Sequence, residues 1–328
     1  MTLLFSGLRA LLTLLKWILI FIAGVLLLLA GLGLIGHISR MRASPPYQMV
    51  DIDDGRRLHV HCEGPKDAPF VLYDAGAFGI YTDGWWIKEA LKADTRICLY
   101  DRAGMGWSDP VPDNISPTPD WHVADIRALR AALGENRPFV LIGHSMAGLR
   151  LHAYANLHPE ELKGLVFIDA VSLQTMRNSR AARLVGWIKP ILNTGIGLAR
   201  LGIMGGLSYL LPDELDLPKQ QTTDKRRATS ALSHHRATKA EILAMLEIDP
   251  AADWFIQMRA GTLPVSVYSN TPGGGRNAST AQQAERQTGF GKITALPDET
   301  HVSLLNRENA KLIAADVRAI LKFSEANR

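Results

Sequence analysis

Short β-type runs alternate with stretches of helical periodicity through the middle of this chain, and this alternation restricts the fold more than any other feature. The β-type runs are residues 70–73, 96–100, 139–142 and 165–168, and the helix-like stretches are residues 84–92, 119–133 and 149–157. Strands that alternate with helices form a mostly parallel sheet that helices cover on both faces. The sequence therefore predicts an α/β fold of this kind.

Further β-type runs extend the expected sheet to eight strands. Residues 50–52 and 57–62 flank Asp53-Asp54-Gly55, a turn signal that predicts an antiparallel hairpin ahead of the parallel strands. Residues 265–268 and 292–296 resume the strand pattern late in the chain. An amphipathic helix over 309–323 is expected to close the domain.

Between residue 171 and about residue 259 the alternation stops and no convincing strand occurs. Helix-like stretches take its place, at 184–192, 196–211 and 239–246. A long insertion without strands, set inside an α/β pattern, predicts a helical cap over the site.

The N-terminus predicts a membrane anchor. No charged residue occurs from Trp17 to Ile35, and about 18 such residues suffice to cross a bilayer. The run exceeds the roughly 7 to 15 residues of a signal-peptide core, so an uncleaved single-pass anchor over residues 1–36 is favoured over a removed signal. Residues 37–46, with Pro45-Pro46, are expected to form a linker to a domain over 47–328. Two basic residues flank the apolar run on each side, Arg9 and Lys16 before it and Arg40 and Arg42 after it. The positive-inside rule therefore does not determine on which side of the membrane the domain lies.

Composition argues against a nucleic-acid partner and leaves undecided whether the two cysteines form a disulfide. The net charge of +4 comes from basic residues scattered among a similar number of acids, so no nucleic-acid partner is expected. Cys62 and Cys98 each lie in a β-type run. Buried free thiols are the favoured interpretation. The alternative is a disulfide between neighbouring strands, which would require an oxidising compartment.

Ser145 is the candidate nucleophile. The run Gly143-His144-Ser145-Met146-Ala147 follows an expected strand directly and precedes an expected helix, the context of a nucleophile elbow. The sharp turn requires small residues two positions to either side, and Gly143 and Ala147 meet this requirement. The same turn aims the backbone amide of Met146 at a bound carbonyl oxygen.

His301 is the candidate base. A serine hydroxyl is a weak nucleophile at neutral pH and needs an adjacent base and a group that orients the base. His301 follows the last expected strand and precedes the final helix. His59 and His61 share one face of a strand, where a sheet-surface role is expected and no metal site. The pair 234–235 lies in a polar part of the cap and is expected to be solvated.

From about Tyr47 to Phe323 the sequence resembles the α/β-hydrolase superfamily. The motifs that carry the resemblance are residues 73–79, residues 100–108, the Ser145 elbow and the His301 loop. The run Asp-Arg-x-Gly-x-Gly-x-Ser in the second motif is typical of relatives similar to bacterial esterases, haloperoxidases and aminopeptidases, and looks structural. The resemblance implies that the amide of Ala77 is the second oxyanion donor.

The acid of the triad departs from the commonest family pattern. In much of the superfamily the acid follows the strand after the cap, but no aspartate occurs from Asn270 to Leu296. Asp169 ends the strand 165–168, and some members carry the acid at this strand end. We expect Asp169 to orient His301, with Glu285 and Asp298 as alternatives.

These residues predict a serine hydrolase that cleaves a carboxylic ester through an acyl-enzyme, with no metal or organic cofactor. Apolar cap stretches beside a bilayer anchor suggest a lipophilic acyl substrate. Amide hydrolysis (amidase or aminopeptidase), acyl transfer and cofactor-free perhydrolysis use the same triad and stay open, as does a catalytically silent ligand-binding protein. Epoxide hydrolase and dehalogenase chemistry is disfavoured, because those relatives place an aspartate where Ser145 stands. The sequence leaves the oligomeric state open.

Overall fold

The computed structural model describes residues 2–41, 43–172, 180–210, 213–246, 248 and 259–327. Its eight strands form one sheet in the order β1-β2-β4-β3-β5-β6-β7-β8. The strands are β1 (Gln48–Asp51), β2 (Arg57–Glu63), β3 (Phe70–Asp74), β4 (Arg96–Tyr100), β5 (Phe139–His144), β6 (Leu162–Ile168), β7 (Val265–Ser269) and β8 (Gly291–Ala295). β2 pairs antiparallel with β1 and β4, and all other neighbours are parallel. The eight-stranded, mostly parallel sheet predicted from the sequence is confirmed.

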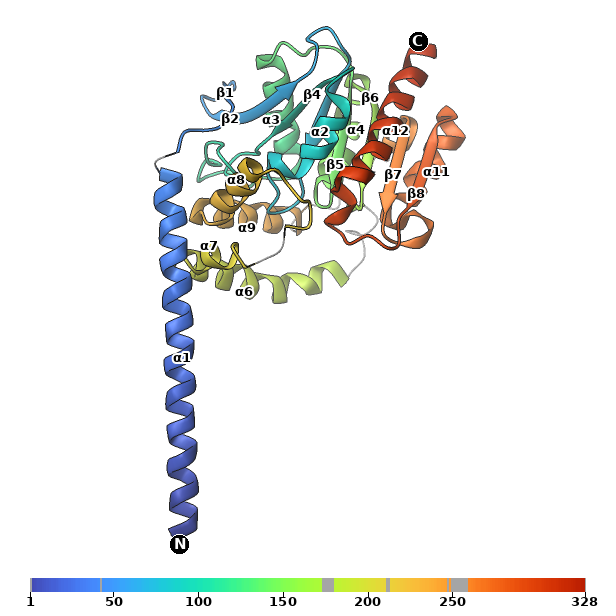
Figure 1. Cartoon of the computed structure of the whole chain (residues 1–328). Coiled ribbons are helices and arrows are strands. Elements are labelled where there is room, and N and C mark those ends of the chain that lie inside the picture. The colour runs from blue at the N-terminus through green and yellow to red at the C-terminus, as the bar shows by residue number, and fades with distance from the viewer. Residues whose placement is uncertain are drawn as a thin grey trace.

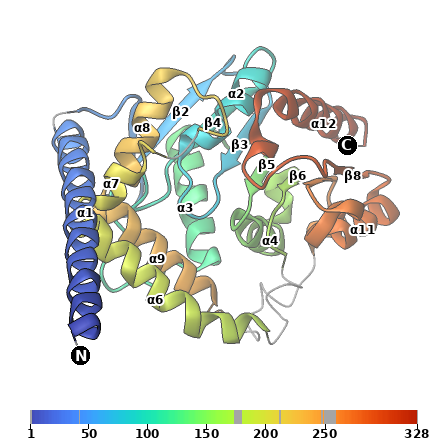
Figure 2. The ribbon, with the colours of Figure 1, turned by 60° about the horizontal axis from the view of Figure 1, so that its bottom comes forward.

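Helices cover both faces of the sheet, as Figures 1 and 2 show. On one face lie α3 (Pro119–Ala132), α4 (Ala147–Leu157) and α11 (Ala278–Thr288), and on the other lie α2 (Trp85–Leu91) and α12 (Arg307–Ala326). Successive strand side chains point to opposite faces. Leu72 and Leu141 therefore join the first core, and Val71 and Val140 join the second. Burial on both faces explains why the central strands are apolar throughout.

A helical insertion lies between β6 and β7. Its helices are α6 (Arg180–Arg200), α7 (Ile203–Leu207), α8 (Lys219–Thr229) and α9 (Leu232–Leu246), and no strand occurs among its described residues 180–210 and 213–246. The single helix expected over 196–211 is divided, because Gly202 adopts a left-handed φ of 74° between α6 and α7. α8 was not expected from the sequence. Residues 173–179, 211–212, 247 and 249–258 of the expected cap lie outside the described residues.

The N-terminal helix α1 (Thr2–Met41) is long and apolar enough to cross a membrane, over Gly7–Ile35 with a mean hydropathy of 3.0. Figure 1 shows that most of α1 stands clear of the rest of the molecule and that its C-terminal part lies beside α7. The helix continues to Met41, so the first residues of the expected linker 37–46 are helical. No proline interrupts the helix before Pro45.

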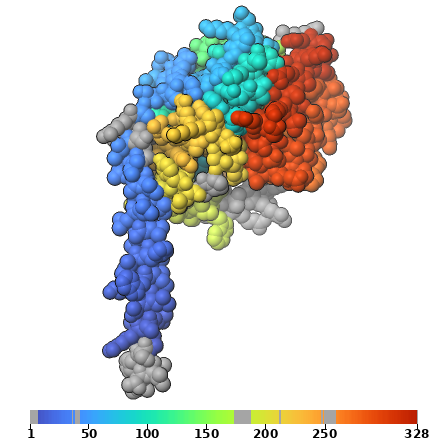
Figure 3. Space-filling model, viewed as in Figure 1, coloured from blue at the N-terminus to red at the C-terminus, as the bar shows by residue number. Residues whose placement is uncertain are grey.

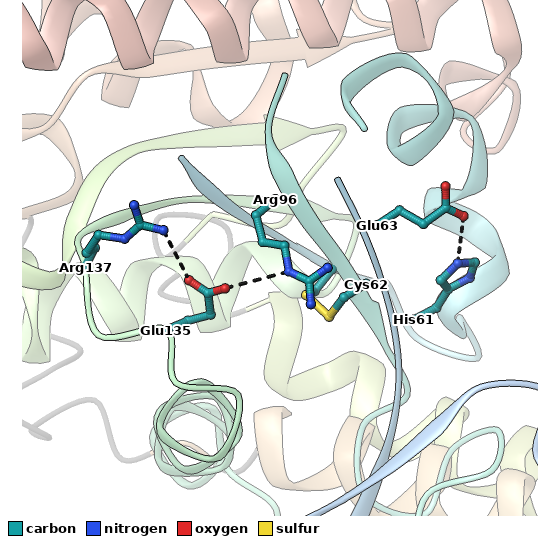
Figure 4. The surroundings of a disulfide bond; sticks show 7 residues. His61, Cys62, Glu63, Arg96, Glu135 and Arg137 are labelled. Carbon is teal, nitrogen blue, oxygen red and sulfur yellow. Dashed lines mark hydrogen bonds and ion pairs between the residues drawn. A yellow bond between two sulfur atoms is a disulfide. The ribbon is translucent and has the colours of Figure 1, made fainter. Parts of the chain in front are cut away.

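Cys62 and Cys98 form a disulfide, so the favoured interpretation as free thiols is wrong. The two residues are directly opposite each other on the antiparallel neighbours β2 and β4. The sequence alone does not fix strand register, and the register decides which side chains meet. Figure 4 shows the bond with Arg96 and Glu135 beside it, whose charged groups lie 3.8 Å apart.

Candidate functional site

Ser145 lies at the turn between β5 and α4, with a φ of 56° that L-residues rarely adopt. The backbone N–H of Ser145 donates to the carbonyl of Ile168, and Val171 N–H donates to the carbonyl of Ser145. A Cβ on Gly143 would lie 2.5 Å from Leu151 Cδ1 and 3.0 Å from the Cβ of Ala147. The tight turn thus leaves no room for a side chain at Gly143, in line with the small residue expected there from the sequence.

His301 and Asp169 meet directly. Nδ1 of His301 donates a hydrogen bond to Oδ2 of Asp169 at 2.5 Å. This hydrogen bond lowers the pKa of Asp169 below its usual value, against the effect of partial burial. The carboxylate is therefore ionised and fixes one edge of the imidazole. Asp169 itself has a φ of 38°, in the left-handed region that Asp tolerates better than most residues.

The two alternative acids lie elsewhere. Oε2 of Glu285 accepts a hydrogen bond from the backbone N–H of Gly291, within the α11 and β8 pair. Asp298 forms no ion pair with His301 among the described residues. The structure therefore pairs His301 with Asp169, the residue chosen from the sequence.

Ser145, Asp169 and His301 line one cavity of about 480 Å³, together with Met146 and Arg276. In the described part of the chain, no hydrogen bond joins Ser145 Oγ to His301. Such contacts are commonly long before substrate binds. The candidate nucleophile, base and acid thus share one cavity at the carboxyl ends of the strands, where open α/β sheets bind ligands.

The loop after β3 packs against the elbow. A Cβ on Gly76 would lie 2.8 Å from the Cβ of Ser145 and 3.2 Å from the carbonyl oxygen of His144. Only glycine permits this approach of the loop to the nucleophile turn, and Ala77 is the next residue along the loop. Phe78 follows with a φ of 58°, which is strained for a bulky residue. The loop therefore packs closely on the elbow and carries Ala77, the expected second oxyanion donor.

Two buried arginines hold this loop from behind. Arg102 donates to the carbonyl oxygens of Ala75 and Gly76 at 2.7 and 2.8 Å. Arg150 donates to Ala75 O at 2.6 Å. All of these groups are buried, so each hydrogen bond is protected from water.

Two buried carboxylates balance the arginine charges. Asp74 accepts from Arg150 Nε at 2.6 Å. Glu241, on α9 of the insertion, accepts from Arg102 at 2.9 Å and from Arg150 at 2.5 Å. The sequence assigned residues 100–108 a structural role but did not reveal this cluster. Arg150, the one charged residue in the sequence of the mostly apolar α4, was the available signal.

His144, next to the nucleophile, supports the base. Its Nε2 donates to the carbonyl oxygen of His301 at 3.0 Å, and the two rings lie 4.5 Å apart. Burial, with a smaller contribution from the charge of His301, lowers the pKa of His144 to about 4. His144 is therefore neutral at physiological pH, and its N–H anchors the His301 loop. The role of His144 was not predicted, because the contact spans 157 positions of the chain.

A second cavity of about 560 Å³ lies between the insertion and the site. Phe78 and Val302, the neighbours of Ala77 and His301, line it on the site side. The insertion supplies the other lining residues, among them Met204 and Leu207 of α7 and the charged residues Asp213, Glu214, Lys225 and Arg226. His235 also lines it. His234 and His235 are buried, not solvated as expected, because α9 packs its histidine face inward.

Candidate metal ligands are already engaged by other partners. His59 pairs with Asp101 at 2.9 Å and His61 with Glu63 at 2.8 Å, and both histidines are buried rather than at the sheet surface. Among the described residues, His158, Glu160 and Glu161 lie close enough to share an ion. Glu161, however, already accepts from Arg127 and Arg130, at 3.0 and 2.5 Å. This arrangement neutralises the Glu161 charge without a metal.

Comparisons with known proteins identify the family of the fold. The family model described as the alpha/beta hydrolase fold matches residues 75–255. An uncharacterised protein of Schizosaccharomyces pombe is 30% identical over 45% of this chain and 34% of its own length. A proline iminopeptidase of Xylella fastidiosa is 33% identical over 42% of this chain and 45% of its own length. An uncharacterised vacuolar membrane protein of Saccharomyces cerevisiae is 27% identical over 43% of this chain and 25% of its own length. The chain thus spans less than half the length of these relatives.

Solved structures share the fold at low sequence identity. An enol-lactonase from Burkholderia xenovorans superposes with a TM-score of 0.58 at 20% identity, over 84% of this chain and 100% of that chain. A thermophilic esterase from Thermogutta terrifontis gives a TM-score of 0.60 at 19% identity, over 84% of this chain and 98% of that chain. These likenesses concern the fold alone.

Proposed function

Because the chain belongs to the alpha/beta hydrolase fold family, we propose that it is a serine hydrolase that cleaves a carboxylic ester at Ser145. One observation carries the proposal. His301 donates to Asp169 at 2.5 Å in the cavity that Ser145 also lines. This is the arrangement of a base with its orienting acid beside a nucleophile on a sharp elbow.

The reaction proceeds in two halves. Ser145 Oγ attacks the acyl carbon while Nε2 of His301 takes the hydroxyl proton, and the backbone N–H groups of Met146 and Ala77 stabilise the oxyanion. His301 then gives the proton to the departing alcohol, which leaves an acyl-enzyme on Ser145. Water attacks the acyl-enzyme while His301 takes its proton, and His301 then returns that proton to Ser145 Oγ as the acid product leaves. Asp169 stays ionised throughout and stabilises the imidazolium.

Amide hydrolysis is the second candidate. The proline iminopeptidase relative supports it, and the same three residues would carry the chemistry. Acyl transfer and perhydrolysis differ only in the nucleophile that attacks the acyl-enzyme. A silent ligand-binding protein is disfavoured, because a binding role does not require the strained elbow or the pairing of His301 with Asp169.

We further propose that α1 anchors the protein in a membrane as a single-pass helix, with the catalytic domain on the oxidising side. The basic flanks of α1 give no orientation, but structural disulfides form and persist in oxidising compartments and are rare in reducing ones. The disulfide between Cys62 and Cys98 therefore selects the side. A maleimide reagent that crosses no membrane should label intact cells or vesicles only after reduction. Labelling of denatured protein without reductant would contradict this orientation.

An ester panel of graded acyl length tests the reaction. Wild type should hydrolyse at least part of the panel, and Ser145→Ala should lose the activity to the background rate. An amide panel of matched acyl groups, measured alongside, separates the two candidates by their kcat/KM values. Equal activity in wild type and Ser145→Ala would refute the proposal.

A further inference from the structure

α7 of the insertion is packed directly on the apolar helix α1. A Cβ on Gly33 would lie 1.6 Å from the carbonyl oxygen of Gly202, and one on Gly206 would lie 2.4 Å from the carbonyl oxygen of Leu29. The glycines thus allow the two backbones to approach closely, as small residues do where helices pack in membranes. The height of α7 along α1 is fixed by this contact.

This height places α7 at the membrane boundary. The uncharged run Trp17–Ile35 has 19 residues, which at 1.5 Å per residue is about 28 Å, close to the hydrocarbon thickness of a bilayer. Leu29 and Gly33 lie in the last two turns of that run. Amphipathic helices that lie on membranes bury their apolar face about 5 to 10 Å deep, which is the level that α7 occupies.

α6 has the composition of a membrane-surface helix. Trp187 and Ile191, one turn apart, are 78% and 66% exposed, and Leu201 and Leu210 beyond its end are 64% and 68% exposed. Residues 180–210 contain four basic residues and no acidic one. Exposed apolar side chains in a segment whose sequence is basic suit the surface of an anionic bilayer.

The arrangement in space agrees with this composition. Figure 1 shows α6 running crosswise to α1, on the side of the molecule toward which α1 extends. Figure 3 shows the space-filling insertion directly beside the upper part of α1, while the lower part stands clear. A membrane crossed by α1 therefore meets α6 and α7.

We propose that α6 and α7 form a membrane-docking surface that delivers a lipid ester from the adjoining leaflet to Ser145. The proposal rests on the proposed function and names its substrate class. Met204 and Leu207 of α7 line the cavity whose opposite wall is Phe78 and Val302. α7 therefore separates the bilayer-facing side of the insertion from a cavity beside the site, and that cavity takes the acyl chain.

The first test compares two substrates on the full-length protein in nanodiscs of phosphatidylcholine and phosphatidylglycerol. Ile191→Glu combined with Leu201→Glu should lower the hydrolysis of a long-chain acylglycerol in the nanodisc by at least about tenfold, and should change hydrolysis of a water-soluble short-chain ester by less than about twofold. The matched control combines Leu157→Glu with Leu312→Glu, two exposed leucines outside the insertion, and should change neither rate. Equal loss on both substrates, or no loss on either, would overturn the docking surface.

The second test needs no turnover. The difference in fluorescence between wild type and Trp187→Phe reports Trp187 alone. This signal should be quenched by lipids brominated near the headgroup end of the acyl chain, because Trp187 contacts the bilayer. An unquenched signal would overturn the proposal. If the proposed chemistry at Ser145 is wrong, wild type hydrolyses neither ester, while the quenching result is unaffected.

Discussion

Nδ1 of His301 lies 2.5 Å from Oδ2 of Asp169, although the two residues are 132 positions apart in the chain. Asp169 directly follows β6, and His301 lies in the loop between β8 and α12. The backbone N–H of Asp169 donates to the carbonyl of Tyr268 on β7, which fixes the carboxylate relative to the sheet. The Asp169 carboxylate is therefore held beside the end of β6, where it meets the His301 loop.

Replacing this carboxylate should disable the base. Asp169→Asn keeps the size of the side chain but removes the charge that selects the imidazole tautomer, so we expect kcat to fall by about 10³- to 10⁴-fold. Glu285→Gln and Asp298→Asn are the controls, because neither side chain pairs with His301 among the described residues. Steady-state kinetics on a short-chain ester make the comparison. Full activity of Asp169→Asn, or its loss in either control, would refute the assignment.

His144 is expected to act as a positioning residue through the loop of His301. His144→Leu removes the N–H that donates to His301 O, so kcat should fall by about tenfold with little change in KM. His144→Gln keeps an N–H donor and should restore most of the rate. A purely structural role would give equal losses in both variants, and that outcome would contradict the account.

The same histidine should make stability depend on pH. Its pKa is lowered to about 4 in the folded protein, whereas a histidine in an unfolded chain titrates near 6.5. Between about pH 4 and 6.5 the unfolded state therefore binds the extra proton, so the free energy of unfolding falls as the pH falls. Above about pH 6.5 His144 is neutral in both states, so it no longer makes the free energy of unfolding depend on pH. One such proton is worth about 1.4 kcal/mol per pH unit.

His144→Gln should reduce this slope by up to about one proton, as measured by urea unfolding at several pH values across the window. Wild type and variant are compared in the same detergent. An unchanged slope would show that His144 does not titrate in the unfolding reaction.

The buried charge cluster predicts a large stability effect from the insertion. Glu241→Ala leaves Arg102 and Arg150 without one of their carboxylate partners, and we expect a loss of about 3 to 5 kcal/mol in the free energy of unfolding. Glu308→Ala removes an exposed partner of Lys311 and serves as the matched control, with an expected change below about 1 kcal/mol. Chemical denaturation measures both. Similar values for the two variants would contradict the proposed importance of the cluster.

Most of the fold could be predicted from local patterns in the sequence. The eight strands and the Ser145 elbow follow from period-two and helical spacing, which depend on near neighbours. Contacts between elements that are far apart in the chain could not be predicted from such patterns. The disulfide between Cys62 and Cys98 depends on how β2 pairs with β4, and the cluster around Arg102 depends on α9, which is 139 positions away. Neither the disulfide nor the charge cluster affects the local periodicity of the sequence.

The division of the expected helix 196–211 had a local cause that the apolar pattern obscured. Gly202 ends α6 in the left-handed conformation, while the apolar residues around it continue the helical spacing. The burial of His234 likewise depends on the loop at Phe78, whose carbonyl accepts its Nε2–H. Such contacts are decided by packing and not by the polarity of neighbouring residues.

The nucleophile assignment is tested most directly by active-site labelling followed by peptide mass spectrometry. A fluorophosphonate probe should add once to folded wild type, on the peptide that contains Ser145. Ser145→Ala should remain unlabelled, and Asp169→Asn should label more slowly. Failure of the folded wild type to label, or equal labelling of Ser145→Ala, would contradict the central claim that Ser145 is the nucleophile.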